Sequence, residues 1–245
     1  MLPELDFAHD ALLLDIDGTL IEIAPTPEAV VVPDSLKRSL TALQPLFGGA
    51  LAFCSGRVLE AVDHLFTPLK LAAIGAHGAE IRYSPDAPFV AVAPPISDAV
   101  KQAFTDVEAR MPGVRVEDKT YTLAFHYRLA PQYESEVLAT IAARLPKLDP
   151  GLVTLRGKAI VEIKSGSFNK GTGLRALMAR PPFMGRRPVF LGDDRTDEDV
   201  LAVLAEYKGL GISVGTLLKG ASAEIPSPAA VRDWLSAMAS EEASR

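Results

Sequence analysis

The sequence predicts an α/β protein with a parallel sheet and a smaller α+β domain inserted into it. Short apolar runs alternate with helical stretches in the first and last thirds of the chain, whereas the middle third lacks this alternation. The length of 245 residues suits one large domain or a body that carries an inserted one. A parallel sheet covered by helices on both faces is therefore expected.

The expected strands of the first third are continuously apolar. In chain order, we expect a strand over 11–14, a helix over 35–46, a strand over 50–54, a helix over 58–65 and a strand over 71–74. In the last third they are residues 188–191, 196–206, 209–214 and a helix from 227 through 234. Strands without polar alternation are typical of a sheet that is buried on both faces. Ser227 as cap and Pro228 at the first helical position indicate the start of the last helix.

The inserted domain is expected to begin at Pro94-Pro95. Its expected elements are a helix over 97–111, strands over 114–117 and 122–127, a helix over 133–145, and a hairpin of 152–155 and 159–163 around Arg156-Gly157-Lys158. Polar residues alternate within these strands, which favours a mostly antiparallel sheet with one solvated face. We therefore assign residues 1–93 and 165–245 to the core and residues 94–164 to the insert.

Composition excludes several classes of function. Lys and Arg number 25 against 31 Asp and Glu, a net charge of −6, and no basic run favours nucleic acid or an anionic membrane. Cys54 is the only cysteine, so an intramolecular disulfide and a Cys-rich zinc site are excluded. The acidic first ten residues and the short apolar run after them do not resemble an export signal. We expect a cytoplasmic protein and take a monomer as the working hypothesis.

Acidic residues follow two of the expected strands. Asp15 and Asp17, in Asp15-Ile16-Asp17-Gly18-Thr19, point to the same side of an extended segment, so that one can attack a phosphorus and the other can transfer protons. Asp193 follows the strand over 188–191 and is the best candidate ligand for Mg²⁺. The alternatives are a loop cap for the first pair and an acid-rich first helical turn for 194–198, which we prefer for Glu198.

Two further segments suit a phosphate group. Ser55-Gly56-Arg57 offers a hydroxyl, a glycine and backbone N–H groups at the start of a helix. Lys170 opens a later helix and can neutralise the transferring group, although a single lysine is usually a solvated surface residue. Cys54 ends a buried strand, and no arginine-closed thiol-phosphatase loop follows it, so we expect a core cysteine.

The order of these motifs resembles that of the haloacid dehalogenase superfamily, and the insert matches the position of that superfamily's larger type of cap. Within the superfamily the chain is similar to the trehalose-6-phosphate phosphatases. The similar segments are residues 15–20, 55–57, 75–80, 116–119, 126–128, 162–164, 169–171 and 192–198. The resemblance implies a Rossmann-like haloacid dehalogenase core with an inserted α+β cap domain.

The resemblance also implies roles for matching residues in the core. Asp15 is the expected nucleophile, Asp17 the general acid and then base, and Ser55 and Lys170 the phosphate ligands. Mg²⁺ is the expected cofactor, held by Asp15, the backbone of Asp17, and Asp193. Asp197 is expected to orient these groups.

In the cap, the resemblance assigns sugar recognition to Glu117, Lys119 and Glu162. A surface ion pair is the alternative for Glu117 and Lys119. Arg57 and His77 are expected to line the cleft, and His126, a residue of the cap, to be packed.

The implied activity is Mg²⁺-dependent hydrolysis of trehalose 6-phosphate to trehalose and phosphate through an aspartyl-phosphate, in trehalose biosynthesis. Sucrose 6-phosphate and mannosyl-3-phosphoglycerate are alternative substrates, because enzymes acting on them share the core chemistry. A phosphomutase would use the same two aspartates but return the phosphoryl group to a sugar. A non-catalytic sugar-phosphate sensor or synthase partner is less favoured, since a binding module needs no nucleophile and proton shuttle.

Overall fold

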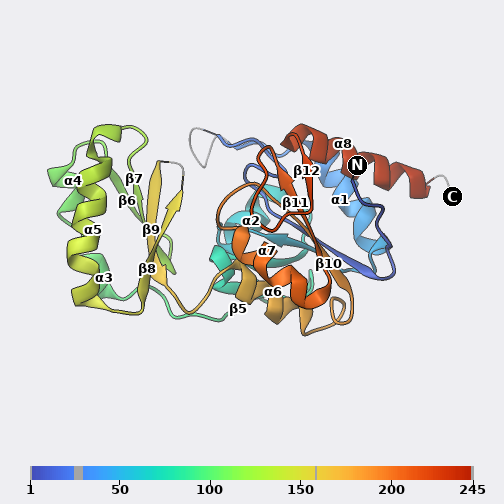
Figure 1. Cartoon of the computed structure of the whole chain (residues 1–245), viewed down its shortest axis with the longest axis horizontal. Coiled ribbons are helices and arrows are strands. Elements are labelled where there is room, and N and C mark those ends of the chain that lie inside the picture. Colours follow the sequence, from blue (N-terminus) through green and yellow to red (C-terminus); the bar gives the residue numbers. More distant parts are fainter. Residues whose placement is uncertain (1, 25–29, 158, 244–245) are drawn as a thin grey trace. The chain divides into compact units, whose positions relative to one another are not determined.

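The computed structural model describes residues 2–24, 30–157 and 159–243, and it divides into two compact units (Figure 1). The core domain comprises Met1–Val92 and Asn169–Arg245, and the cap domain comprises Ala93–Phe168. The sequence-based interval for the insert, 94–164, lies inside the cap domain. Among the described residues, no helix has both the length and the apolar character needed to cross a membrane.

The described residues of the core domain form an eight-stranded sheet in the order β12-β11-β10-β1-β2-β3-β4-β5. Its parallel strands are β1 (Asp10–Leu14), β2 (Leu51–Cys54), β3 (Ala72–Gly75), β10 (Arg187–Gly192), β11 (Leu210–Val214) and β12 (Ala223–Ile225). Two short antiparallel strands, β4 (Glu80–Arg82) and β5 (Val90–Ala91), extend one edge. The parallel sheet expected from the sequence is confirmed, whereas β4, β5 and β12 were not expected.

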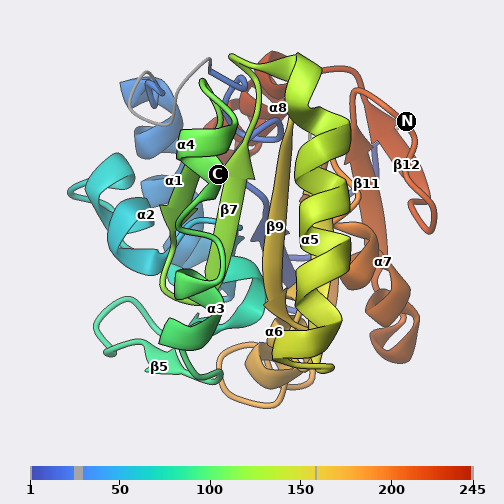
Figure 2. The same cartoon turned by 90° about the vertical axis from the view of Figure 1, so that its left-hand side faces the viewer.

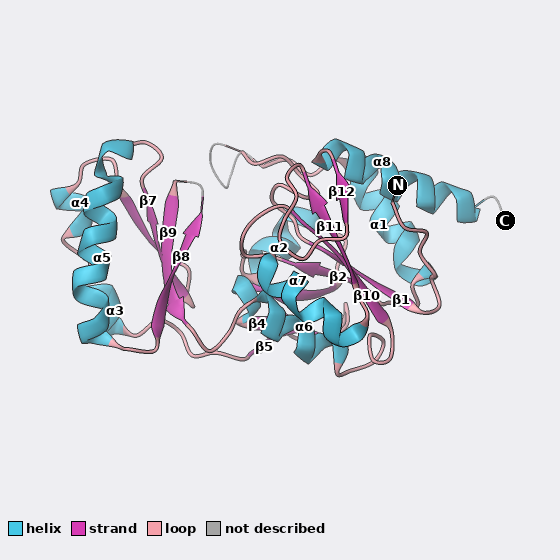
Figure 3. Cartoon of the chain, viewed as in Figure 1, coloured by secondary structure: helices cyan, strands magenta, loops and turns pink. Residues whose placement is uncertain are grey.

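Helices cover both faces of this sheet, as the apolar strands predict (Figure 3). Leu12 and Leu14 pack with α1 (Asp34–Leu46), α2 (Leu59–Phe66) and α8 (Pro228–Ala243). Ala11 and Leu13 point to the other face and pack with α6 (Lys170–Met178) and α7 (Glu198–Leu204). Helix α8 continues beyond Trp234, where the sequence-based helix ended. In the described part of the chain, short 3₁₀ turns also span Ala76–Gly78, Pro131–Tyr133 and Ala205–Tyr207.

The cap domain contains a four-stranded antiparallel sheet in the order β6-β7-β9-β8. Strands β7 and β9 of this sheet lie side by side in Figure 2. The strands are β6 (Arg115–Asp118), β7 (Thr122–His126), β8 (Leu152–Gly157) and β9 (Ile160–Ser165), and the helices are α3 (Asp98–Gln102), α4 (Val107–Arg110) and α5 (Glu134–Leu148). Leu123, Phe125, Val161 and Ile163 alternate along β7 and β9 and pack against the helices. The α+β insert is thus present, although Lys158 of the expected hairpin turn lies outside the described residues.

The single helix expected over 97–111 is wrong, because α3 and α4 are separate. The break lies at residues 103–106, where Arg144 of α5 donates hydrogen bonds to the carbonyl oxygen of Ala103 and, through two nitrogens, to Asp106 at 2.6 and 2.8 Å. The backbone amide of Val107 donates its hydrogen bond to the carbonyl oxygen of Phe104 instead of that of Ala103. A partner from another helix thus satisfies the backbone group that a continuous helix would have used.

The strand order brings the chemical motifs to one edge of the core sheet. Strand β1 lies between β10 and β2, and β3 follows β2. Because the carboxyl ends of parallel strands share an edge, segments 15–19, 55–57, 76–78 and 193–197 all begin there. The topology therefore gathers residues that are up to 182 positions apart in the chain, from Asp15 to Asp197.

Replacing Leu13 by alanine tests the packing that holds β1 in place. Leu13 is fully buried, so its truncation should lower the free energy of unfolding by about 2–5 kcal/mol, measured by urea denaturation. Leu217→Ala is the matched control, because Leu217 is 63% exposed and should change stability by less than about 0.5 kcal/mol. Equal effects of the two substitutions would contradict the buried position of Leu13.

Candidate active site

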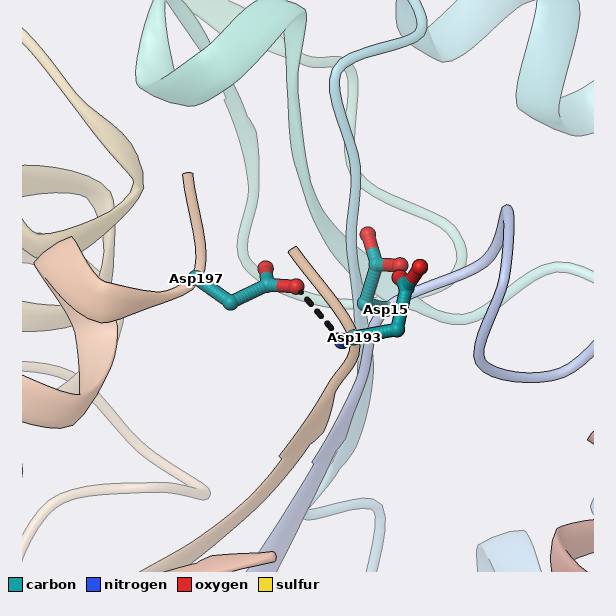
Figure 4. Close-up of side chains that lie close together, drawn as sticks. All are labelled: Asp15, Asp193 and Asp197. Atoms are coloured by element: carbon teal, nitrogen blue, oxygen red, sulfur yellow. Dashed lines mark hydrogen bonds between the residues drawn. The ribbon is translucent and has the colours of Figure 1, made fainter. Parts of the chain in front are cut away.

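Three carboxylates from two strand ends form a compact cluster in the core domain. Asp15 follows β1, and Asp193 and Asp197 follow β10. One oxygen of each lies within 4.8 Å of an oxygen of the others. Figure 4 shows the carboxylates of Asp15 and Asp193 together, with Asp197 reaching toward the backbone nitrogen of Asp193. The sequence-based placement of Asp15 and Asp193 in one site is consistent with this geometry.

Lys170 joins two of these carboxylates. Its Nζ atom donates hydrogen bonds of 2.7 Å to Oδ1 of Asp15 and 2.7 Å to Oδ1 of Asp197, and all three side chains are buried. The lysine is the first residue of α6, whose start is fixed by a capping box between Asn169 and Thr172. The usual role of a single lysine, a solvated surface charge, therefore does not apply here.

The cluster carries more negative charge than Lys170 balances. Burial raises the pKa of Asp15 well above its ordinary value, and the Asp197 and Asp193 carboxylates raise it further while Lys170 lowers it. Burial, Asp197 and Asp194 raise the pKa of Asp193 to about 7. Although burial lowers the pKa of Lys170, the Asp15 and Asp197 carboxylates outweigh burial and raise it. Close like charges away from water favour protonation or a bound cation.

Asp197 is already fully engaged by protein donors. Lys170 bonds to its Oδ1 atom, and the backbone amides of Asp193 and Asp194 donate to its Oδ2 atom at 2.9 and 3.2 Å. Its carboxylate thus fixes the chain after β10 and the lysine at the same time. The carboxylate of Asp193 and the Oδ2 atom of Asp15, which Lys170 does not contact, are therefore best placed to bind a cation. A set of oxygen ligands suits Mg²⁺.

Gly18 and Thr19, which follow the two aspartates of the first motif, both lie against Asp193. Gly18 has φ +88°, and a Cβ atom there would lie 2.0 Å from Oδ2 of Asp193. Glycine is therefore required both for the left-handed turn and for the approach of Asp193. Thr19 donates a hydrogen bond of 3.3 Å to Oδ1 of Asp193. The Asp-Gly-Thr segment thus shapes the space beside the carboxylate cluster.

Asp17 does not join the carboxylate cluster. Its two carboxylate oxygens accept hydrogen bonds of 2.7 Å each from Nε and Nη2 of Arg57. The Arg57 side chain is 19% exposed and that of Asp17 is 35% exposed. Sequence reasoning placed Arg57 in the cleft but missed this pair, because residues 40 positions apart give no signal of contact in a single sequence.

The loop after β2 is tied to the loop after β3. The backbone amide of Arg57 donates to the buried Ser55 Oγ atom at 3.1 Å. In turn, the carbonyl oxygens of Ser55 and Arg57 accept hydrogen bonds from the amides of His77 and Ala76. A Cβ atom on Gly56 would lie 2.5 Å from the imidazole of His77, so this ring packs directly on the Ser-Gly-Arg segment.

Cys54 is a core residue, as its position in the sequence predicts. It ends β2, is fully buried, and packs with the apolar residues beneath α6 and α7. Burial also raises the pKa of its thiol above the ordinary value. A buried thiol of raised pKa is a poor nucleophile.

In the cap domain, the expected sugar-binding residues lie on the sheet face opposite the one covered by helices. Strand register aligns Glu117, Ala124 and Glu162 across β6, β7 and β9. Lys119 donates to Glu162 at 2.7 Å, and His126 lies 2.8 Å from Glu117, whose pKa the contact with His126 lowers. The hydrogen-bond partners of Glu117 and Lys119 are thus His126 and Glu162, and Lys119 acts on Glu117 through its charge, which also lowers the pKa of Glu117. His126, which we expected to be packed, is 29% exposed and joins this polar face.

Comparison with known proteins gives a consistent family. The sequence profile of a family described as trehalose-phosphatase matches residues 13–229. A probable trehalose-phosphate phosphatase of Sinorhizobium fredii is 39% identical over 237 residues, covering 96% of this chain and 89% of that protein. The trehalose-6-phosphate phosphatase of Escherichia coli is 39% identical over 242 residues, covering 95% of this chain and 87% of that protein.

Solved structures agree on the fold. The C-terminal domain of the Candida albicans trehalose-6-phosphate phosphatase has a TM-score of 0.82 at 22% identity and covers 95% of this chain and 92% of that chain. A phosphatase of the haloalkanoate enzyme superfamily from Bacteroides thetaiotaomicron has a TM-score of 0.62 at 17% identity, with coverage of 97% of each chain. These structures thus share the fold of this chain, a parallel α/β core with an inserted cap.

The family profile spans most of the described chain, and the relatives match nearly its whole length at 39% identity. The buried Lys170 with its carboxylates and the loop over 55–57 lie within the matched residues. On these grounds the chain belongs to the trehalose-phosphatase family of phosphoric monoester hydrolases.

Proposed function

We propose that the protein hydrolyses trehalose 6-phosphate to trehalose and phosphate with Mg²⁺ as cofactor, within trehalose biosynthesis. The observation that carries the proposal is the contact of Lys170 with Asp15 at the end of the central strand, beside Asp193. This arrangement joins a carboxylate nucleophile to a fixed positive charge. The names and extent of the matching relatives support the choice of substrate.

Asp15 is the proposed nucleophile. One of its oxygens attacks the phosphorus, the bond from phosphorus to the sugar oxygen breaks, and an aspartyl-phosphate forms. Water then attacks this phosphorus and releases phosphate and free Asp15. Two easier steps replace one very slow hydrolysis, and the carboxylate expelled in the second step is a good leaving group. Lys170, 2.7 Å from Asp15, holds the nucleophile and reduces its repulsion of the anionic substrate.

Asp17 is the proposed proton carrier. It donates a proton to the departing sugar oxygen and then accepts one from the attacking water, so the two steps use the same carboxyl group in opposite directions. The Ser55 hydroxyl is proposed to bind the phosphate oxygens, next to the Asp17 partner Arg57. His77 is proposed to line the cleft from the loop that supports this segment.

The residues present fit a divalent cation at Asp15 and Asp193, with the Asp17 backbone as the third proposed ligand. When bound there, Mg²⁺ would neutralise negative charge on the carboxylates and on the phosphate oxygens. Asp197 keeps its structural role, because both of its oxygens already accept hydrogen bonds from the protein. Thr19 helps to orient Asp193 for this task.

Sugar recognition is proposed for Glu117, Lys119 and Glu162. Carboxylate and ammonium groups on one sheet face can bind vicinal hydroxyls, and a wrong sugar would leave such groups without partners. The pairing of Lys119 with Glu162 also holds both side chains in place before substrate arrives.

A phosphate-release assay tests the proposed substrate. Trehalose 6-phosphate should be hydrolysed with a kcat/KM at least tenfold above those of sucrose 6-phosphate, mannosyl-3-phosphoglycerate and glucose 6-phosphate, and EDTA should abolish activity until Mg²⁺ is restored. Release of trehalose with phosphate excludes a phosphomutase. Preference for another sugar phosphate, or full activity after exhaustive chelation, would contradict the proposal.

Asp15→Asn should abolish phosphate release while leaving the fold intact, because the amide has nearly the same shape but cannot form the acyl-phosphate. A loss of at least about 10³-fold in kcat is expected, with an unchanged circular dichroism spectrum. Asp233→Asn serves as the control, since Asp233 is exposed on α8 and should leave kcat unchanged. Substantial turnover by verified Asp15→Asn protein would remove Asp15 from its role.

Alanine at Glu117, Lys119 or Glu162 should lower kcat/KM for trehalose 6-phosphate by about tenfold to a hundredfold each, because each loses a paired polar contact. A small ester such as p-nitrophenyl phosphate should be affected less than about threefold, since it lacks the sugar. Lys147→Ala is the control for Lys119→Ala, because Lys147 is an exposed lysine of α5. Equal losses on both substrates would show that these residues support cap structure instead of recognition.

A further inference from the structure

Arg57 makes a two-pronged contact with Asp17. Nε donates to Oδ2 and Nη2 donates to Oδ1, each at 2.7 Å, so the planes of guanidinium and carboxylate are aligned. Among the residues that the structure describes, Arg57 is the side chain that hydrogen-bonds to this carboxylate. Asp15, two residues earlier, is held by Lys170 instead. The two aspartates of the motif therefore have separate cationic partners.

The backbone of Arg57 is itself held firmly. Its amide donates to the Ser55 Oγ atom, and its carbonyl oxygen accepts from the amide of Ala76 at 2.7 Å. The carbonyl oxygen of Ser55 accepts from the amide of His77 at 3.1 Å. Ala76 and His77 adopt φ values of +48° and +55°, a region that residues with side chains rarely occupy. This unusual backbone lies where the loop after β3 meets the backbone of Ser55 and Arg57.

We infer that Arg57 is a positioning residue for Asp17: its guanidinium fixes the direction of the carboxyl group that transfers the proton. The inference rests on the proposed function, in which Asp17 protonates the leaving sugar oxygen. Proton transfer needs the two heavy atoms within hydrogen-bond reach, and small displacements lower the rate strongly. Two of the guanidinium nitrogens face Asp17, so this role differs from the direct contact with substrate expected from the sequence.

The inference has a consequence that depends on the leaving group. A sugar alkoxide is a poor leaving group and needs the proton from Asp17, whereas p-nitrophenolate departs without one. Because kcat/KM reports the steps up to departure of the leaving group, damage to Asp17 positioning should lower kcat/KM for trehalose 6-phosphate selectively. Loss of a phosphate contact would instead lower kcat/KM for both esters.

A double-mutant cycle separates these two roles. We compare kcat/KM for radiolabelled trehalose 6-phosphate in the wild type, Arg57→Lys, Asp17→Asn and the double variant, since lysine keeps the charge but cannot form the fork. In the wild-type background, Arg57→Lys should lower kcat/KM for trehalose 6-phosphate by about tenfold to a hundredfold. In the Asp17→Asn background, the same substitution should lower kcat/KM by less than about twofold, because no proton-donating carboxyl group is left to position. Its kcat/KM for p-nitrophenyl phosphate should fall less than about threefold.

Equal losses from Arg57→Lys in both backgrounds would overturn the positioning role and leave the proposed function intact. Wild-type kcat/KM for Arg57→Lys would overturn it as well. Wild-type activity of Asp17→Asn would overturn both this inference and the acid role of Asp17. Arg175→Lys is the matched control: Arg175 forms a similar fork with the exposed Glu206, so its replacement should leave all rates unchanged. Arg57→Gln, with thermal unfolding measured in parallel, replaces Arg57→Lys if the latter does not fold.

Discussion

The contact of one buried ammonium group with two buried carboxylates determines the arrangement of the rest of the site. Lys170 binds Asp15 on one side and Asp197 on the other, at 2.7 Å each. A charge without a partner would be very costly in this environment, so each member requires the others. The carboxylate of Asp197 in turn accepts hydrogen bonds from the backbone amides of Asp193 and Asp194, and thereby sets the direction of the chain after β10.

This contact depends on the topology of the core sheet. Lys170 reaches Asp15 because α6 covers the face next to β1 and begins directly where the chain returns from the cap domain. The strands β10, β1 and β2 bring the other groups to the same edge. The cap domain supplies a separate polar sheet face with its own contacts, a hydrogen bond between Glu117 and His126 and an ion pair between Lys119 and Glu162. Contacts between polar side chains therefore organise both the site in the core domain and this face of the cap domain.

Much of this could be predicted from the sequence because the signals are local. Apolar runs marked β1, β2, β3 and β10, and the acids after β1 and β10 followed directly from them. The break between α3 and α4 could not be predicted, because it depends on Arg144 some 40 residues away. For the same reason the fork of Arg57 on Asp17 was missed. Strands β4, β5 and β12 span only two or three residues each and carry almost no periodic signal.

If Asp15 carries the phosphoryl group during turnover, chemical trapping can detect it there. The wild-type enzyme is quenched during hydrolysis of trehalose 6-phosphate, the protein is reduced with borohydride, and its peptides are sequenced by mass spectrometry. An acyl-phosphate is reduced to an alcohol, whereas a free carboxylate is not. We expect homoserine at position 15 only when substrate and Mg²⁺ are both present. An intact Asp15 throughout steady turnover, or reduction at another carboxyl group, would contradict it.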